Sequence, residues 1–532
     1  MDNNRTILAV VLIVLLWSGY SLFFAPQPQV PQVAAVDEIK DEKQLIKEVI
    51  KSDITTVKTH ADFIVNADEK ESFLTVSSDF LDIKLSTVGA TIRSIVLKNY
   101  NETNDADSDL FTLLNSDDFD LSTLQTSGSD GLYIPKNLNY KVLDSRKIID
   151  VNKENVEVRF VASINNLTIV KTYTFHPASY SFDLNIQLTN NSPNPVGGRL
   201  NLSLIAFWDK DDKSGMYTFV GPVTYDGEDL QEDKPAKLEE SPKIYKNKTV
   251  WSGYVSKYFL NAIDPHESSE QLFISAGAGY VENKFTSAQL TLLTEQVASF
   301  DYTSYFGPKD DQFLLAAGHQ FDEVINYGFF HPLSKPLMVV LKFFYKYIGN
   351  YGFAIILLTI CIKLIFWPLT QKSYKSMKGM QKLQPEMKKM REKHGSDKQK
   401  LNQEMMSFYK ENKVNPMGGC LPMIIQIPVF FALYRVLLGS IELRHAPWML
   451  WITDLSAKDP YYVTPLIMGV TMFLQQKMTP TNMDPTQEKI MLMMPVVFTF
   501  MFLNFPAGLV LYWLTNNLLT ILQQYLIRRQ PD

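Results

Sequence analysis

The stretch FAIILLTICIKLIFWPL, residues 353–369, decides the fold class of this chain. It is long and apolar enough for a membrane-spanning helix, yet it carries one charge, at Lys363. A lysine is costly in hydrocarbon, so its side chain either lies in a water-filled cavity or reaches back to the membrane surface. The residues of this stretch alone leave both possibilities open.

Further apolar segments predict more spans, at residues 7–24, 421–440, 461–476, 490–505 and 508–527. The first predicts an uncleaved membrane anchor, although a cleaved signal peptide is the alternative reading. The segments 461–476 and 490–505 are short for a bilayer, about 24 Å for 16 helical residues, and a tight turn joins 490–505 to 508–527. We therefore expect six spans and a locally thinned bilayer.

Charge is distributed unevenly along the chain. Residues 25–335 hold 28 Lys/Arg against 45 Asp/Glu, whereas residues 371–417 hold 12 against 5. By the positive-inside rule the basic loop is cytoplasmic, which places the acidic domain outside and both chain ends inside. The chain is therefore predicted to be a multi-pass membrane protein with its acidic domain outside.

The acidic domain follows a Pro/Gln-rich and charged linker and shows alternating apolar residues typical of strands. Examples are Leu81/Ile83/Leu85, Val156/Val158/Phe160, Phe182/Leu184/Ile186/Leu188 and Leu200/Leu202/Leu204. Asn, Asp, Gly and Pro clusters separate these runs. The pattern predicts a large antiparallel β-sandwich.

Catalytic and metal-binding residues are sparse. The chain has two cysteines, Cys361 and Cys420, so we expect no disulfide framework or metal cluster in the acidic domain. His60, His176, His266 and His319 with nearby carboxylates could be combined into a site, but no spacing fixes a nucleophile, a base and an orienting group. We expect no enzyme activity, no cofactor and no metal.

Two amphipathic regions flank the opening stretch. Residues 329–348 predict an interfacial helix with Lys335, Lys342 and Lys346 on one face. The basic segment 371–417 predicts a helical hairpin, because two apolar stripes can face each other. We assign its flexible methionines and one phenylalanine to a partner-contact surface. These residues are Met377, Met380, Met387, Met390, Met405 and Phe408.

The later spans contain no Asp or Glu, which argues against a proton-coupled transporter. They do contain uncharged polar side chains at helical spacing, for which hydrogen bonding between helices is the plain alternative to a polar groove. Several such stripes around Lys363 favour a groove open to the cytoplasm. The candidate groove residues are Lys363, Thr359, Gln426, Tyr512, Trp513, Asn516 and Asn517.

The segment 363–437, GSIELRHAPWMLWITDLSAKDPYY at 439–462, MGVTMFLQQKM at 468–478 and FPAGLVLYWLTNNLLTILQQ at 505–524 resemble the YidC/Oxa/Alb family of membrane insertases. The anchor, linker and β domain resemble the Gram-negative bacterial form, whose periplasmic domain is similar to sugar-mutarotase sandwiches without their catalysis. The resemblance implies a hydrophilic groove within the bilayer. Lys363 stands where the family usually has arginine, which keeps the charge but loses the bidentate fork. Thr359, Gln426 and Asn517 also fall at positions that resemble the family's groove lining.

The resemblance implies a non-enzymatic insertase and chaperone for inner-membrane proteins, acting alone or with the Sec translocon. Its partners would be nascent membrane proteins, the Sec translocon, ribosome or signal recognition machinery at the hairpin, and the lipid bilayer, without sequence-specific nucleic acid. A pure assembly chaperone at the translocon is the alternative. A small-solute transporter is disfavoured.

The predicted fold is a membrane all-α bundle of six transmembrane helices, five forming the insertase core, with a periplasmic all-β sandwich and a cytoplasmic helical hairpin. The predicted segments are an anchor at 1–25, a linker at 26–56, the β-sandwich at 57–328, the interfacial helix at 329–348, the second span at 349–370, the hairpin at 371–417, the third span at 418–440, a periplasmic loop at 441–460, the fourth span at 461–476, a cytoplasmic loop at 477–489, the fifth span at 490–505, the sixth span at 508–527 and a tail at 528–532.

Overall fold

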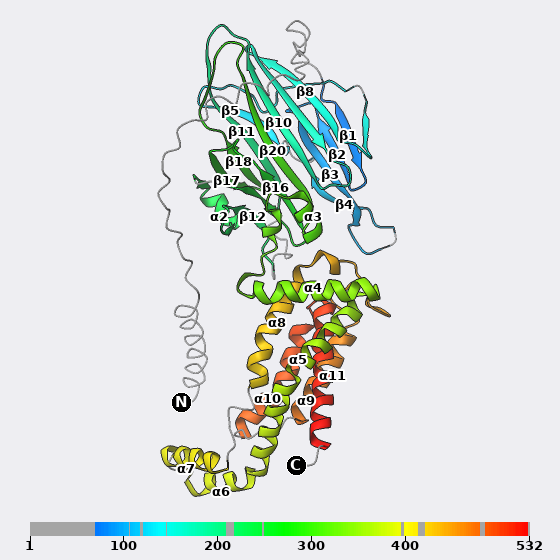
Figure 1. Cartoon of the computed structure of the whole chain (residues 1–532), viewed down its shortest axis with the longest axis vertical. Helices are drawn as coiled ribbons and strands as arrows, with labels where there is room; N and C mark the ends of the chain where they lie inside the picture. The colour runs from blue at the N-terminus through cyan, green and yellow to red at the C-terminus, as the bar shows by residue number, and fades with distance from the viewer. Residues whose placement is uncertain are drawn as a thin grey trace, which may run out of the picture. The chain divides into compact units, whose positions relative to one another are not determined.

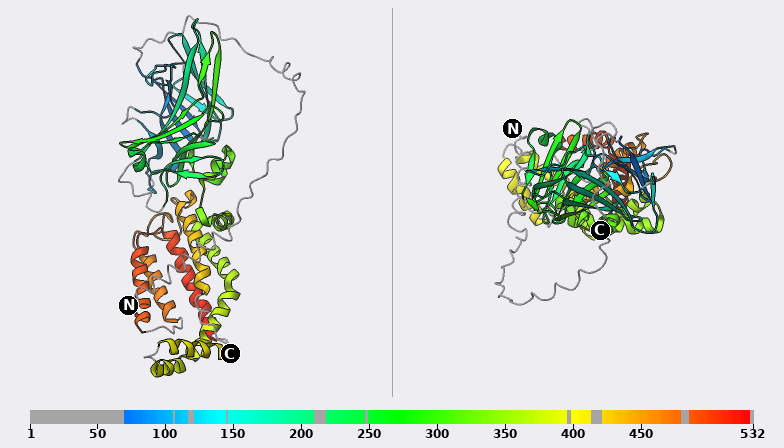
Figure 2. Two further views of the ribbon diagram at one scale, coloured as in Figure 1. Left: turned by 90° about the vertical axis from the view of Figure 1, so that its left-hand side faces the viewer. Right: turned by 90° about the horizontal axis from the view of Figure 1, so that it is seen from above.

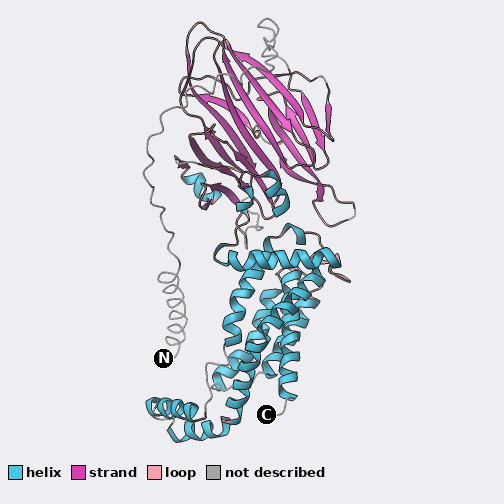
Figure 3. Cartoon of the chain, viewed as in Figure 1, coloured by secondary structure: helices cyan, strands magenta, loops and turns pink. Residues whose placement is uncertain are grey.

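The computed structural model describes residues 70–529 apart from 106, 117–120, 145, 209–217, 247–248, 395–397, 413–420 and 479–484. The predicted anchor and linker lie outside the described residues. Strands make up most of the described residues as far as residue 308, and helices make up most of the described residues after it (Figure 3).

A nine-stranded sheet runs through the β domain in the order β13-β12-β15-β16-β20-β10-β9-β8-β6 (Figure 1). Buried and less buried residues alternate in β9 and β10, most regularly in β9, where LTIVKTYTF places every second side chain in the core, whereas β12, β15 and β16 are buried at every position. The strands are β6 (Lys141–Val142), β8 (Val156–Ile164), β9 (Leu167–Phe175), β10 (Ser181–Asn190), β12 (Gly221–Tyr225), β13 (Leu230–Glu232), β15 (Trp251–Val255), β16 (Phe259–Asp264) and β20 (Val297–Pro308).

Two smaller sheets complete the domain. The five-stranded sheet has the order β4-β3-β2-β1-β7, and the six-stranded sheet has the order β14-β17-β18-β11-β19 with β5 paired to β11. Their strands are β1 (Phe73–Ser78), β2 (Leu81–Ser86), β3 (Thr91–Asn101), β4 (Leu110–Asn115), β5 (Gln125–Ser129), β7 (Ile148–Val151), β11 (Val196–Phe207), β14 (Lys243–Tyr245), β17 (Gln271–Gly277), β18 (Tyr280–Thr286) and β19 (Leu290–Leu292).

The alternation correctly located strands at β2, β8, β10 and β11. The expectation of purely antiparallel pairing was wrong at β1 and β7, which run parallel. Apolar side chains from all three sheets contribute to one hydrophobic core, which includes the fully buried Trp251. This shared core joins the sheets into one large β domain.

Helices follow the last strand. They are α3 (Asp311–Ala317), η2 (Phe321–Val324), η3 (Gly328–Phe330), α4 (His331–Ile348), α5 (Tyr351–Lys382), α6 (Gln384–His394), α7 (Lys398–Glu411), α8 (Leu421–Gly439), η5 (Ile441–Leu443), α9 (Val463–Met478), α10 (Pro485–Phe502) and α11 (Ala507–Arg529), after the short α2 (Pro235–Glu240) within the β domain. Within the helical part, α4 lies across one end of the bundle and α6 and α7 lie at the other (Figures 1 and 2).

Helix boundaries differ from the expected ones in two places. Helix α5 does not end at residue 370 but continues through Pro368 to Lys382, so the basic segment contains the end of α5 and two further helices rather than a simple two-helix hairpin. Helix α10 begins at Pro485, within the expected cytoplasmic loop. Composition could not show either boundary, because polar residues continue a helix as readily as apolar ones once it has formed.

Within the described residues, one helix is long and apolar enough to cross a membrane by itself, at Tyr351–Tyr374 with mean hydropathy 2.2. Shorter apolar helices occur at Gln426–Gly439 and Met491–Phe502. Helices α5, α8, α9, α10 and α11 all contribute to a second hydrophobic core, separate from that of the sheets. Lys363 lies on α5 between Ile362 and Phe366, two side chains that pack against this core.

Candidate functional site

Lys363 points into the helical bundle. Its Nζ donates a hydrogen bond of 2.7 Å to Thr520 Oγ1 on α11, and that hydroxyl donates to the main-chain oxygen of Asn516 at 2.6 Å. The ammonium group therefore has one hydroxyl acceptor, and within the described residues its side chain makes no ion pair with a carboxylate. A lysine held in this way retains the capacity to donate two further hydrogen bonds.

A small cavity adjoins Lys363. About 20 Å³ of it is open to the centre of a water molecule, which is room for about one water. Its lining comes from α5 and α8 and consists of Ile362, Lys363, Phe366, Leu369, Thr370, Gln426 and Val429. The polar centre is therefore narrow in this conformation, and its walls are largely apolar.

Uncharged polar side chains connect α11 to its neighbours on either side of Lys363. Gln426 Nε2 on α8 donates to the hydroxyl oxygen of Tyr512 at 3.1 Å, and Gln523 Nε2 donates to Thr370 Oγ1 on α5 at 2.6 Å. These bonds satisfy groups that lipid could not. Together with Lys363 and Thr520 they form a polar seam between α5, α8 and α11.

The other predicted groove residues lie elsewhere in the bundle. Thr359 is buried and donates from Oγ1 to the carbonyl of Ile355 in its own helix, at 2.7 Å. Asn517 Nδ2 lies 3.4 Å from Thr471 Oγ1 on α9, so it connects a different pair of helices. Asn516 contributes its main-chain carbonyl to the Thr520 hydroxyl.

Trp513 packs in an aromatic cluster instead of the polar seam. Its ring lies 4.7 Å from that of Phe430, 6.1 Å from Phe498 and 5.2 Å from Phe502, measured between centroids. Such edge-to-face and stacked contacts stabilise the packing of α8, α10 and α11. The seven residues predicted as one groove thus divide into a polar seam, a pair with α9, a bond within α5 and an aromatic cluster.

Thr370 belongs to the seam although the sequence analysis did not single it out. It lies seven residues after Lys363, two helical turns along the same face of α5. This spacing could have identified it, because residue 370 lies within the predicted second span.

The predicted contact surface of the basic segment is partly buried. Met377 and Met380 at the end of α5 and Met387 on α6 are each less than 10% exposed. Met390, Met405 and Phe408 are partly exposed. In this structure the first three side chains pack within the helical segment, and the other three are accessible to a partner.

Two family models match this chain. The family model described as the YidC periplasmic domain matches residues 74–340, and the model described as the 60Kd inner membrane protein matches residues 343–532. The chain is 43% identical over 534 residues to the membrane protein insertase YidC of Geotalea daltonii, covering 99% of each protein. It is also 43% identical over 537 residues to that of Geobacter sulfurreducens, covering 99% of this chain and 98% of the relative.

Two solved structures are also similar. The crystal structure of an active YidC insertase with its first transmembrane domain resolved is 18% identical, with a TM-score of 0.38, and the match covers 87% of this chain and 94% of that one. A galactose mutarotase related enzyme from Lactobacillus acidophilus is 9% identical, with a TM-score of 0.33 over 44% of this chain and 97% of that one. The identity to the curated relatives extends over nearly the whole chain. The chain therefore belongs to the YidC family of membrane protein insertases, non-enzymatic proteins of the inner membrane with a periplasmic domain.

Proposed function

We propose that the seam around Lys363 is where a hydrophilic segment of an incoming membrane protein enters the bilayer. The observation that carries this proposal is the direction of Lys363, whose ammonium group faces α11 and bonds one neutral hydroxyl. A carboxylate of the substrate would make a charge-assisted hydrogen bond with this group, which is stronger than the bond to Thr520. Substrate capture would thus add a stronger partner to an ammonium group that the Thr520 hydroxyl already directs towards α11.

The energetic reason is desolvation. A polar segment that crosses hydrocarbon loses its bonds to water at a cost of several kcal/mol, and polar side chains along the path lower that cost. Gln426, Tyr512, Thr370 and Gln523 supply such groups beside Lys363. Because the cavity is small, entry requires the helices to separate.

The apolar part of the substrate would leave along α8 and α10, which would be the third and fifth spans. Both helices expose large apolar side chains that suit contact with lipid or a substrate helix. On α8 these include Ile424, Ile427 and Phe431, and on α10 Val496, Val497 and Phe500. Burial of the substrate helix in lipid would drive the reaction.

We further propose the finer architecture and partners expected from the sequence. The architecture has six spans with residues 7–24 as the first, a periplasmic β-sandwich and a basic cytoplasmic helical segment. In this arrangement α6 and α7 present their charged side chains to ribosome or signal recognition machinery, and the Sec translocon is a further partner. The net positive charge of residues 371–417 supports contact with ribosomal RNA surfaces or anionic lipid without sequence readout.

The test is insertion into liposomes that contain the purified full chain. Lys363→Ala should lower insertion of a substrate with an acidic translocated tail by more than about tenfold, since a charge-assisted bond contributes about 1.5–3 kcal/mol. Lys363→Arg should retain insertion because the charge remains. A substrate with a neutral tail should be affected less.

Lys372→Ala is the matched control, since Lys372 is an exposed lysine on the same helix. It should insert both substrates as the unmodified protein does. Equal insertion of the acidic-tail substrate by Lys363→Ala and by the unmodified protein would remove the charge from the mechanism. An equal loss for acidic and neutral tails would show that Lys363 supports the bundle rather than substrate capture.

A further inference from the structure

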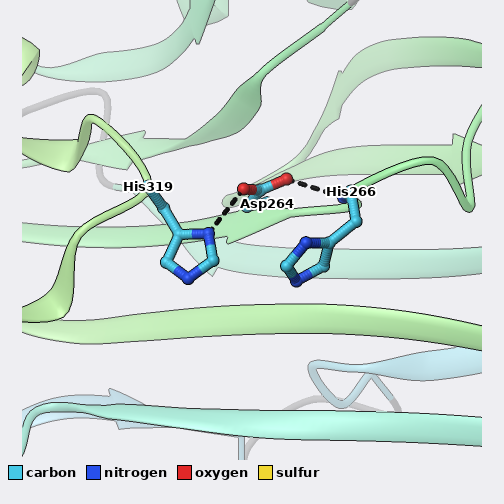
Figure 4. A group of neighbouring side chains, drawn as sticks. All are labelled: Asp264, His266 and His319. Atoms are coloured by element: carbon cyan, nitrogen blue, oxygen red, sulfur yellow. Dashed lines mark hydrogen bonds and ion pairs between the residues drawn. The ribbon is translucent and has the colours of Figure 1, made fainter.

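Two histidines and an aspartate meet beside the end of β16, an interior strand of the nine-stranded sheet, far from the seam in sequence. Asp264 is the last residue of β16, His266 follows it by two residues, and His319 comes directly after the C-cap of α3. Their potential ligand atoms all lie within 4.8 Å of one another. Figure 4 shows the two imidazole rings flanking the Asp264 carboxylate.

The carboxylate organises this cluster. Asp264 Oδ2 lies 2.7 Å from His319 Nδ1, and Asp264 Oδ1 accepts the main-chain N–H of His266 at 2.6 Å. The two rings are nearly perpendicular, at 87°, with centroids 5.1 Å apart. Asp264 is buried while the histidines are more accessible, so the cluster is anchored on one side and open on the other.

His266 contacts a row of polar side chains that lie opposite one another on neighbouring strands. Asp264 on β16 is opposite Thr303 on β20, which is opposite Asp183 on β10. His266 Nε2 lies 3.1 Å from Thr303 Oγ1, and that hydroxyl donates to Asp183 Oδ1 at 2.7 Å. A histidine whose second nitrogen is held through a hydroxyl to a carboxylate is oriented as metal-binding histidines usually are.

We propose that Asp264, His266 and His319 bind one divalent cation of the Zn²⁺ class, with water at the remaining coordination position. Two imidazoles and one carboxylate are ligands that Zn²⁺ commonly takes in proteins. Because Nε2 of His266 is engaged by Thr303, its Nδ1 is the nitrogen that remains for the ion. The low cysteine count did not reveal this site, since the ligands come from histidine and aspartate.

Binding would replace the 2.7 Å hydrogen bond between Asp264 and His319, because both side chains would then share the cation. Both histidines also have left-handed backbone angles, φ 49° at His266 and 55° at His319, which few residues other than glycine adopt. The structure around them thus holds both rings in position.

The cation would link two parts of the β domain. His319 lies in the connection that leads from α3 through η2 towards α4, and the adjacent Gln320 accepts a hydrogen bond from Trp251 Nε1 through its main-chain oxygen, at 2.9 Å. An ion shared by His319 and the end of β16 would pin this connection to the sheet. Bound metal should therefore raise the thermal stability of the folded chain.

The test uses the untagged full chain in detergent after removal of metal with a chelator. Zn²⁺ is titrated in competition with a chromophoric chelator, and Co²⁺ serves as a spectroscopic probe of coordination. We expect one Zn²⁺ per chain, an affinity lowered more than about tenfold in His266→Gln and in His319→Gln, and an unchanged affinity in His445→Gln. The Co²⁺ complex should show the intense visible bands of a tetrahedral site.

His266→Gln keeps the bond between Asp264 and His319, so it tests the site even if His319→Gln weakens the fold. Circular dichroism of each variant verifies folding. Absence of saturable binding would overturn the proposal, and so would equal affinity of the His266→Gln variant and the unmodified protein. A Co²⁺ spectrum identical to that of the hydrated ion would overturn it as well.

Discussion

The β domain and the helical bundle each contain a lysine that turns inward, and the two are held in different ways. Lys171 on β9 is fully buried, and its Nζ donates to the main-chain oxygens of Gly89 at 3.1 Å and Leu124 at 2.8 Å. Lys363 on α5 is partly exposed and donates to the hydroxyl of Thr520. Among the described residues, neither lysine makes an ion pair with a carboxylate.

The difference separates a structural lysine from an available one. Main-chain oxygens cannot move away from Lys171 without moving their strands, so this lysine cross-links β9 to two other segments. The ammonium group of Lys363 has one hydroxyl partner and an adjoining cavity. A buried lysine therefore indicates a binding site when it has room for a further partner, and a structural role when it does not.

A third lysine gives the largest expected effect and extends the comparison to a charged partner. Lys342 on α4 lies 2.5 Å from Glu442 on η5, whose side chain is 10% exposed. Burial raises the pKa of Glu442 despite the nearby lysine, so the carboxylate is already poorly solvated. Lys342→Met should lower the stability of the purified protein by about 2–3 kcal/mol, measured by thermal unfolding in detergent, because an unpaired carboxylate stays buried.

The double variant Lys342→Met/Glu442→Gln is the control. It should recover most of the lost stability, since Glu442, the most buried of the three carboxylates near Lys342, is then uncharged. Equal melting temperatures for Lys342→Met and the unmodified protein would show that the pair is as weak as a surface ion pair.

Lys171→Met is expected to cost less, about 1–3 kcal/mol, because it leaves two neutral carbonyl groups without their donor. Thermal unfolding of the full chain would measure this loss. Insertion per folded molecule should be unchanged, in contrast to Lys363→Ala. A drop in insertion without a drop in melting temperature would break the distinction between the two lysines.

The sequence shows more clearly for Lys363 than for Lys171 that the lysine is unusual. Lys363 is conspicuous because a single charge interrupts an apolar run. Lys171 follows the same strand alternation as Leu167, Ile169, Tyr173 and Phe175, which places it on the inward face of β9. That pattern could have identified a buried lysine, but a strand signal is normally interpreted from its apolar residues.

The partners of these side chains could not be predicted. Thr520 lies 157 residues after Lys363, and His319 lies 55 residues after Asp264, so no local spacing connects them. Strand periodicity located the β domain because each strand carries its own pattern. The pairing of distant elements depends on packing of the whole chain, which periodicity does not contain.

Thr520→Val probes the partner of Lys363 rather than the charge. Loss of a neutral hydrogen bond of about 0.5–1.5 kcal/mol should lower insertion of acidic-tail substrates about twofold to tenfold, because the lysine is no longer held towards α11. The liposome assay measures this directly. Thr515→Val, a buried threonine on the same helix, should have no such effect. Equal or higher insertion by Thr520→Val would show that Thr520 competes with the substrate rather than positioning Lys363.

Lys171 should also make the stability of the folded chain depend on pH. Burial lowers the pKa of Lys171 from 10.5 to about 7, so between these values the unfolded chain binds more protons than the folded chain. Stability should therefore rise as the pH increases above about 7, and this contribution is lost as the pH falls to the folded pKa. Melting temperatures of the metal-free protein between pH 7 and 9 would measure the slope.

Other groups titrate near this range, so the informative quantity is the difference between two profiles. Burial lowers the pKa of Lys309 to about 8, and the bond to Asp264 raises the pKa of His319, which acts on stability in the opposite direction. Both contributions are common to the unmodified protein and Lys171→Met. The difference in melting temperature between the unmodified protein and Lys171→Met should grow as the pH increases. Parallel profiles would mean that Lys171 stays charged in the core, because its two carbonyl partners stabilise the charge more than burial disfavours it.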